Sequence, residues 1–364
     1  MSDLRTLLDR AIGPFDPSLE RALDLTVRRA AQRQRRRRVG AAVVGLAASL
    51  VALGFAIWAF AGSDESRPAG AERGRFMLIG GDMLGRAENR LYTMDGDGGD
   101  LRAIPSGDLY LFAAAPSPDG ERVALMASQP WPKDEMPNIQ LFLMGSDGSD
   151  LREIPACPED GCQGTIEVSW SPDGRSLSFP GNGIGINVLD IRTGATRRLT
   201  GGSNLDDDAA WSPDGRLIAF SRTEPSLDPG ENAQIWVMRA DGTGAHQVTD
   251  EAFAHDASQP AWSPDGTTIA YTEGGRPGGT AGIAVIDVDG SNARQLTACT
   301  FGTCDRFPTN PAWSPDGSAI AVLWHEARLT RAAVALVDPE TGDLRVVREL
   351  QFAALSLYWQ AGTP

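Results

Sequence analysis

The stretch WSPDGRLIAF, residues 211–220, decides the fold because the chain repeats it. Its tetrapeptide Ser-Pro-Asp-Gly occurs five times in the 364 residues, and the intervals between successive copies are 54, 41, 51 and 51 residues. Four copies directly follow a tryptophan, and the first follows Pro116. Self-similarity at this period is typical of propellers and other repeat architectures. We therefore expect one structural unit for each copy.

Each repeat predicts a small antiparallel sheet. The tetrapeptide is followed by a short apolar run, such as IAF at 218–220, then by a second run, such as IWVM at 235–238, and by an Asp-Gly or Thr-Gly turn. Pro presets φ and Gly accepts a positive φ, so Ser-Pro-Asp-Gly suits the tight turn between the first two strands. A four-stranded sheet of about 45 residues cannot bury both of its faces alone, and radial stacking into a propeller solves this while protecting the edges.

The two ends of the chain predict how the ring closes. Residues 75–105 supply three strands without a first strand before them, and residues 355–359, LSLYW, form a first strand with no Ser-Pro-Asp-Gly after it. The expected fold is therefore all-β, a six-bladed β-propeller over residues 75–360 in which the C-terminal strand closes the N-terminal blade. The repeated side chains take a structural role in this interpretation: Trp170, Trp211, Trp262, Trp313, Trp359, Asp119, Asp173, Asp214, Asp265 and Asp316.

The repeats resemble those of a known family. The pattern P-A-W-S-P-D-G-x-x-I-A-F/Y, followed by I-W-V-M-x-A-D-G-T-G-x-x-Q-V-T, is similar to the WD-like propeller repeats of the TolB family, and residues 211–249 match it closely. The resemblance implies the fold but leaves the function open, because propellers host unrelated activities. It also implies a signal peptide and an α/β domain before the propeller. Here we expect only a linker, residues 63–74, so a Tol–Pal role is not expected.

The charge distribution predicts a membrane anchor. The net charge of −15 divides into +5 for residues 1–38 and −20 for the remainder, and residues 40–62 between them carry no charge. A run of 23 apolar residues is long enough to cross a bilayer, and the arginines on its N-terminal side place that side in the cytoplasm. We expect a cytoplasmic basic helical tail at 1–38, a transmembrane helix at 39–62, and the propeller outside the cytoplasmic membrane. A cleavable signal peptide and a buried helix are the alternatives.

The tail and the arginine usage give further expectations. Only one of the 33 basic residues is a lysine, Lys133, which is typical of a GC-rich bacterial genome. The tail is similar to the short cytoplasmic segments of actinobacterial membrane proteins, some of them anti-sigma-like regulators, although it lacks His and Cys. It would either lie on anionic lipid or contact a cytoplasmic partner.

The four cysteines form two pairs with the spacing Cys-x4-Cys, Cys157 with Cys162 and Cys299 with Cys304. In an exported domain such pairs indicate two local disulfides. A four-cysteine zinc site is the alternative, but the pairs lie three blades apart in a six-bladed ring. We expect no metal and no cofactor.

Candidate binding residues lie in the loops that precede the repeat tryptophans. They are an acidic run and two mixed pairs: Asp206, Asp207, Asp208, His255, Asp256, Asp305 and Arg306. The recurring Asp-Gly pairs superficially resemble calcium loops, but their regular place between the third and fourth strands favours hairpin turns. No Gly-x-Ser-x-Gly motif is present, and we predict no catalytic residue.

These observations favour a non-catalytic module that binds a protein, a peptide or an envelope component outside the membrane. A propeller lyase or hydrolase acting on an extracellular polymer is one alternative. A sensor that signals through residues 1–38 to a cytoplasmic regulatory partner is another. The acidic propeller argues against a nucleic-acid partner.

Overall fold

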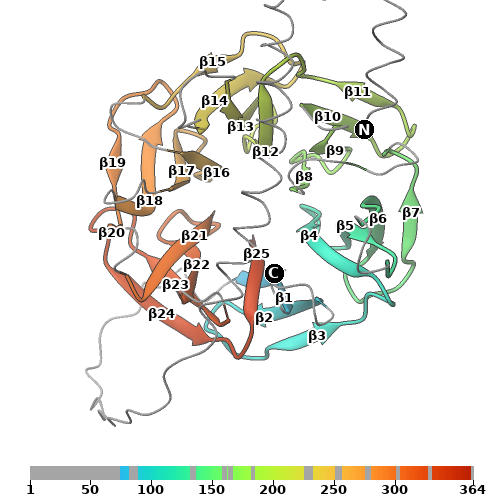
Figure 1. Ribbon diagram of the computed structural model, residues 1–364, viewed down its shortest axis with the longest axis horizontal. Helices are drawn as coiled ribbons and strands as arrows, with labels where there is room; N and C mark the ends of the chain where they lie inside the picture. Colours follow the sequence, from blue (N-terminus) through green and yellow to red (C-terminus); the bar gives the residue numbers. More distant parts are fainter. Residues whose placement is uncertain are drawn as a thin grey trace, which may run out of the picture. The chain divides into compact units, whose positions relative to one another are not determined.

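The computed structural model describes residues 74–81, 89–131, 137–157, 162, 167–181, 185–224, 233–250, 256–274, 280–300, 304–326 and 330–361. These residues form six β-sheets arranged in a ring (Figure 1). The predicted tail, transmembrane segment and all but the last residue of the linker lie outside the described residues. Within the described ranges, no helix is long and apolar enough to cross a membrane.

Five blades use consecutive strands, with the first strand of each nearest the axis. Blade 2 contains β4 (Tyr110–Pro116), β5 (Arg122–Ser128), β6 (Gln140–Gly145) and β7 (Arg152–Ile154). Blade 3 contains β8 (Ser169–Trp170), β9 (Ser176–Pro180), β10 (Ile186–Asp190) and β11 (Thr196–Arg198). Blade 4 contains β12 (Leu205–Trp211), β13 (Leu217–Thr223), β14 (Ala233–Arg239) and β15 (His246–Gln247).

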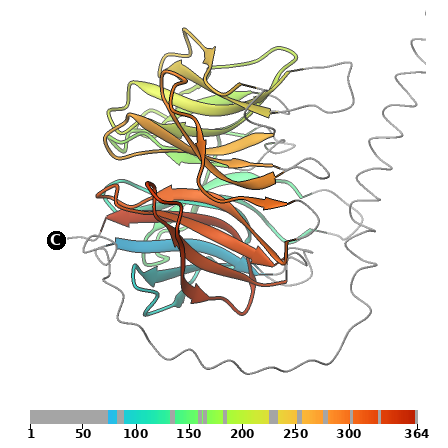
Figure 2. The same cartoon turned by 90° about the vertical axis from the view of Figure 1, so that its left-hand side faces the viewer.

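The remaining consecutive blades follow the same plan. Blade 5 contains β16 (Ala257–Trp262), β17 (Thr268–Glu273), β18 (Thr280–Asp287) and β19 (Arg294–Gln295), and the short β20 (Cys299–Thr300) also pairs with β18. Blade 6 contains β21 (Arg306–Trp313), β22 (Ile320–Glu326), β23 (Ala332–Val337) and β24 (Leu344–Glu349). Viewed from the side, the strands run between the two faces of the ring (Figure 2).

Blade 1 joins the two ends of the propeller. Its strands are β25 (Ala353–Ala361), β1 (Gly74–Gly81), β2 (Arg90–Asp95) and β3 (Arg102–Ile104). The C-terminal β25 pairs antiparallel with β1, with Phe76 opposite Trp359. The predicted six-bladed ring, closed by its C-terminal strand, is therefore confirmed. The added strand covers the inner edge of β1, which would otherwise be unpaired.

The Ser-Pro-Asp-Gly turns have the predicted geometry. In blade 4, Gly215 has a φ of +71°, which an L side chain rarely adopts. The carboxylate of Asp214 accepts hydrogen bonds from the hydroxyl of Ser212 at 2.7 Å and from the backbone N–H of Arg216 at 3.0 Å. The same Ser–Asp hydrogen bond recurs in the other four copies. Each repeat aspartate thus fixes the turn between an inner strand and its neighbour.

Stacking buries both faces of each blade, as the repeat pattern predicts. On β5, Val123 and Leu125 pack toward blade 1, whereas Ala124 and Met126 pack toward blade 3. Side chains alternate across a strand, so a strand covered on both faces is apolar throughout. The buried apolar residues accordingly fall into six clusters among the described residues, one between each pair of neighbouring blades.

Three of the repeat tryptophans tie their own blade to the one before it. The indole N–H of Trp170 donates to the carbonyl of Ala115 at 3.0 Å, that of Trp262 to Ala210 at 3.0 Å, and that of Trp313 to Ala261 at 3.2 Å. These three indoles link neighbouring blades, in agreement with the structural role expected for the repeat tryptophans.

The junction between blades 3 and 4 differs from the other five. Its buried cluster has only four residues, Ile186, Ile218, Phe220 and Met238. The indole nitrogen of Trp211, at the same junction, is buried without a hydrogen-bond partner among the described residues, as is that of Trp359 in blade 1. The first strand of blade 3, β8, has only two residues. Among the described residues, this junction has the smallest buried apolar cluster of the six.

Candidate functional site

A ring of polar side chains surrounds the propeller axis. They occupy the position three residues before the tryptophan in each of five inner strands or in the segment just before one: Glu167, Asp208, Gln259, Asn310 and Ser356. In blade 2 the corresponding residue is Ala113. Equivalent positions of stacked repeats lie at the same height along the axis, so the repeat itself brings these side chains together.

Backbone bulges turn three of these residues out of the regular pleat. Asp208, Gln259 and Asn310 have φ values of +54°, +54° and +53°. Each lies where the register between the first and second strands shifts. A bulge of this kind re-aims a side chain, and it is common beside binding sites.

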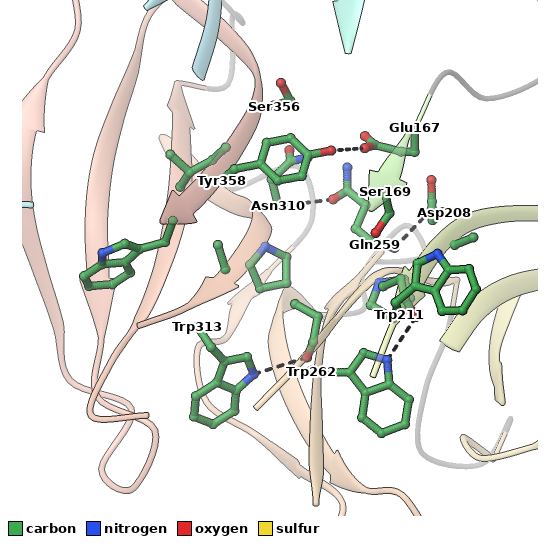
Figure 3. A pocket seen from close by; sticks show the side chains of 18 of the residues that line it. Glu167, Ser169, Asp208, Trp211, Gln259, Trp262, Asn310, Trp313, Ser356 and Tyr358 are labelled. Atoms are coloured by element: carbon green, nitrogen blue, oxygen red, sulfur yellow. Dashed lines mark hydrogen bonds between the residues drawn. The ribbon is translucent and has the colours of Figure 1, made fainter. Parts of the chain in front are cut away.

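The bulged residues are linked from blade to blade (Figure 3). The backbone N–H of Gln259 donates to Oδ2 of Asp208 at 3.1 Å, and the backbone N–H of Asn310 donates to Oε1 of Gln259 at 3.0 Å. Ser221 donates to Oδ2 of Asp208 at 3.2 Å, and Thr272 donates to Oε1 of Gln259 at 2.9 Å. These contacts fix the orientation of the two side chains in advance of any ligand.

Two buried carboxyl groups, those of Glu167 and Asp208, lie near each other at the junction between blades 3 and 4. Burial and the nearby charge of Asp208 raise the pKa of Glu167 to about 7. Burial raises the pKa of Asp208 to about 6, against the opposing effect of the hydrogen bond from Gln259. The hydroxyl of Tyr358 donates to Oε2 of Glu167 and to the carbonyl of Val168, both at 3.1 Å.

These groups line a central cavity of about 430 Å³. Its walls carry the indoles of Trp211, Trp262 and Trp313, and none of its described lining residues is Lys, Arg or His. Ser356 also lines it, is only 1% exposed, and has a hydroxyl oxygen without a hydrogen-bond partner among the described residues. The cavity is therefore acidic, partly aromatic and not neutralised by the residues that line it.

The cavity extends toward the face that carries the Ser-Pro-Asp-Gly turns. Pro264 and Pro315, which belong to these turns, are exposed and line it. A groove of about 1250 Å³ adjoins it over blades 1 and 2 and shares Ser169, Tyr358 and Trp359 with it. The loops that precede the tryptophans, where the sequence predicted the binding surface, lie at the opposite ends of the inner strands.

The structure gives the predicted acidic run three different environments. Asp206 is 1% exposed and forms a two-point ion pair with Arg222, at 2.6 and 2.9 Å. The guanidinium group of Arg222 also lies over the ring of Trp236, at 4.6 Å. Asp206 therefore has a structural role inside blade 4. Asp207 follows it on β12, and Asp208 is the member of the run that lines the cavity.

The other predicted binding residues lie away from this cavity or outside the described residues. His255 is not described, and the neighbouring Asp256 is exposed. Asp305 is also exposed. Arg306 lies in β21, where its guanidinium group contacts both carboxylate oxygens of Glu349, at 2.8 and 3.1 Å. Asp256, Asp305 and Arg306 therefore do not line the cavity with Asp208.

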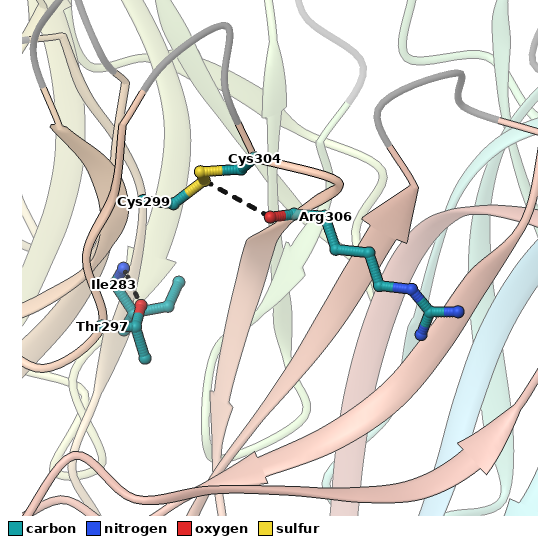
Figure 4. Close-up of a disulfide and its surroundings, with 5 residues drawn as sticks. All are labelled: Ile283, Thr297, Cys299, Cys304 and Arg306. Carbon is teal, nitrogen blue, oxygen red and sulfur yellow. Dashed lines mark hydrogen bonds between the residues drawn. A yellow bond between two sulfur atoms is a disulfide. The ribbon is translucent and has the colours of Figure 1, made fainter. Parts of the chain in front are cut away.

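Both predicted disulfides are present, Cys157–Cys162 and Cys299–Cys304. Cys162 is buried against the cluster between blades 2 and 3, and its N–H donates to the carbonyl of Ile139 at 2.8 Å. Cys299 contacts the carbonyl of Arg306 at the start of β21 (Figure 4). Each disulfide therefore anchors a loop to the first strand, or the segment before it, of the next blade.

The described residues contain no group of three or more His, Cys, Asp or Glu side chains that could hold a metal ion. His325 is buried, and burial lowers its pKa to about 4. Its Nε2 lies 3.0 Å from the hydroxyl of Thr309, which donates to Asn310 at 3.0 Å. His246 is exposed on the outer strand β15. Neither histidine lines the cavity.

Sequence reasoning missed four lining residues of the polar ring: Glu167, Gln259, Asn310 and Ser356. The signal was present in the repeat. Alignment of the five inner segments on their tryptophans places a polar residue three positions earlier in each. Of the five residues, only Asp208 was predicted as a binding residue, because it ends a run of three aspartates.

Comparison with known proteins agrees with this architecture. The TolB beta propeller domain matches residues 75–354. The chain belongs to this family. A solved TolB from Acinetobacter baumannii is similar in fold, with a TM-score of 0.62 and 20% identity, over 81% of this chain and 68% of that one.

Curated relatives of this TolB-family propeller match over shorter lengths. An uncharacterized protein of Agrobacterium fabrum is 29% identical over 163 residues, which cover 42% of this chain and 53% of that protein. An uncharacterized peptidase of Bacillus subtilis is 38% identical over 66 residues, 18% of this chain and 9% of that protein. The chain thus spans about half the length of the first relative and a small part of the second.

Proposed function

We propose that this TolB-family propeller is a membrane-anchored binding module that presents its central cavity to a protein, peptide or envelope component outside the cytoplasmic membrane. The observation that carries the proposal is the oriented acidic cavity on the propeller axis. Binding sites are concave, largely preformed, and lined by apolar surface with a few convergent polar groups. The inter-blade hydrogen bonds of Asp208 and Gln259 meet this description.

The location outside the membrane is supported by two features. The uncharged residues 40–62 follow an arginine-rich segment, and the Cys157–Cys162 and Cys299–Cys304 disulfides suit an oxidising compartment. We expect the full chain to remain in the membrane pellet after a high-salt wash. Without prior reduction, we expect its four cysteines to resist alkylation. Release by salt, or four free thiols in the native protein, would contradict this part of the proposal.

Site-specific photo-crosslinking in cells tests the binding role. A photoreactive phenylalanine analogue at Gln360, which lines the groove beside the cavity, should form an adduct of discrete mass. The same analogue at Glu153, exposed on the outer strand β7, is the matched control. Absence of an adduct at position 360, or the same adducts at both positions, would contradict a binding site on this face.

A further inference from the structure

The acidic pair on the axis lacks the positive partner that buried carboxylates normally have. Glu167 and Asp208 come from neighbouring blades, and no described residue that lines the cavity is basic. The guanidinium group of Arg222, also in blade 4, is hydrogen-bonded to both carboxylate oxygens of Asp206. Burying an ionised carboxylate away from water without a positive partner costs free energy. The site therefore favours either a proton or a bound cation.

A second feature points to a ligand at the same place. The hydroxyl oxygen of Ser356 is buried in the wall of the cavity and has no hydrogen-bond partner among the described residues. A buried polar atom normally has a partner, which is often a water molecule or a ligand. Figure 3 shows Ser356, Glu167 and Asp208 in the upper part of the view, Trp211 beside Asp208, and Trp262 and Trp313 below.

We propose that Glu167, Asp208 and Ser356 bind the ammonium group of an alkylamine, such as the lysine side chain of a peptide partner. The proposal rests on the binding function argued above and names the ligand chemistry of that site. An alkylammonium group has three donors and no acceptor, which matches two carboxylates and one hydroxyl oxygen. The indoles of Trp211 and Trp262 offer apolar surface to its methylene chain.

The size of the cavity and the adjoining groove favour an amine carried on a longer chain. About 430 Å³ is within the range of small-molecule pockets and exceeds the volume of a single ion. The groove of about 1250 Å³ continues from the cavity past Tyr358 and Trp359. A peptide lying in this groove would direct one side chain into the cavity.

The donor set fits an organic cation better than a metal ion. Calcium requires six to eight oxygen ligands, and magnesium requires octahedral geometry. The carboxyl of Asp208 already accepts hydrogen bonds from Ser221 and Gln259, and Oε1 of Gln259 already accepts from Thr272 and Asn310. Few oxygen lone pairs are left for a metal, whereas an ammonium group needs only three acceptors.

Binding of a cation must be coupled to loss of protons. The charged groups that face Glu167 are Asp208 on β12 and, beyond it, Asp207, while Tyr358 on β25 supplies a hydroxyl. With a pKa of about 7, Glu167 is mostly protonated at pH 6 and mostly ionised at pH 8. If the ionised form binds the amine, affinity should rise about tenfold from pH 6 to pH 8.

Calorimetry on the purified full-length chain tests this inference. The probe is Nα-acetyl-lysine methylamide, and the matched neutral probe is Nα-acetyl-norleucine methylamide, which has the same chain length without the amine. We expect the lysine probe to bind with proton release, visible as a dependence of the heat on the buffer, and to bind at least about tenfold more tightly than the norleucine probe. Glu167→Gln should remove this difference, and Glu153→Gln on the outer strand should retain it.

Three outcomes would overturn the inference. The first is equal binding of the two probes, and the second is unchanged lysine binding by a folded Glu167→Gln variant. The third is complete displacement of the lysine probe by calcium, which would make the site a metal site. If 1,5-diaminopentane binds more tightly than the lysine probe, the source of the amine is a small molecule and not a peptide. A crosslinked adduct at position 360 without amine affinity would refute this inference while leaving the binding function in place.

Discussion

The carboxyl group of Glu167, which lines the cavity, lowers the stability of the folded protein when it is ionised. In an unfolded chain its carboxyl would ionise near pH 4.5, whereas burial and the charge of Asp208 raise its pKa in the fold to about 7. The folded protein therefore binds more protons than the unfolded chain between these pH values. Stability consequently falls as pH rises through this window, and the loss is complete above the folded pKa.

Replacement of Glu167 by Gln should remove this loss. The amide has nearly the same shape and no charge, so the variant should unfold at a higher temperature than the wild type at pH 8. We expect a gain on the order of 2 kcal/mol. At pH 4, where the wild-type carboxyl is mostly protonated in both states, the two proteins should differ little. Thermal unfolding followed by circular dichroism between pH 4 and pH 8 measures this difference.

The control for this experiment is Glu153→Gln, the same chemical change on the exposed outer strand β7. It should leave the pH dependence of unfolding unchanged. If the Glu167→Gln variant is less stable than the wild type at pH 8, other groups in the fold must stabilise the ionised carboxylate. In that case the charge of Glu167 does not destabilise the propeller.

At the level of elements, the Ser-Pro-Asp-Gly turn is the unit that the sequence specifies most directly. The hydrogen bonds from Ser212 and Arg216 hold the pKa of Asp214 below its usual value, so the ionised form is the one that stabilises the turn. Asp214→Ala should lower the free energy of unfolding by about 1 kcal/mol at pH 7. This difference should shrink as pH falls below about 4, because the wild-type carboxyl then becomes protonated.

Denaturant unfolding of the Asp214→Ala variant measures this contribution. Asp108→Ala provides the comparison, since Asp108 is exposed. It should change stability by less than about 0.5 kcal/mol. Equal effects of the two substitutions would mean that the aspartate of the turn is not a structural residue.

The same elements show which features sequence reasoning can reach. Turn chemistry and strand periodicity are local, so the blades, the disulfides and the closing strand LSLYW could be predicted from short patterns. The site was only partly predictable, because Glu167, Asp208 and Ser356 are far apart in the sequence and meet through the ring. Asp206 shows the opposite case, because the acidic run suggested a binding residue whereas its ion pair with Arg222 is buried inside blade 4. Whether a charge is paired depends on cross-strand register, which the acidic run alone does not reveal.

At the scale of the whole molecule, the ring depends on the pairing of β1 with β25. These strands lie about 280 residues apart in sequence, so closure must overcome a large loss of chain entropy. It also holds Tyr358 against Glu167, and it places Leu357 in the cluster between blades 6 and 1. The stability of the cavity and the closure of the ring are therefore linked.

A disulfide across this closure should stabilise the entire propeller. Arg75 and Gln360 are register partners on β1 and β25, and directly opposed residues of antiparallel strands have Cα separations compatible with a disulfide. The Arg75→Cys/Gln360→Cys variant should therefore form a third disulfide. Its loop would enclose most of the propeller, for which chain-entropy arguments give an upper limit of about 5 kcal/mol.

The oxidised double variant should unfold at a higher temperature than the wild type, and neither single variant should do so. The difference in unfolding temperature between this variant and the wild type reports on ring closure only if all blades unfold together. A disulfide between the two ends cannot stabilise a blade that unfolds independently. An unchanged unfolding temperature with the third disulfide formed would therefore mean that the ring opens elsewhere first. The junction between blades 3 and 4 is the place where such opening should begin, since it has the smallest apolar cluster among the described residues and carries the acidic pair. In that case Glu167→Gln, which relieves the charge at this junction, should restore the effect of the disulfide when the two changes are combined.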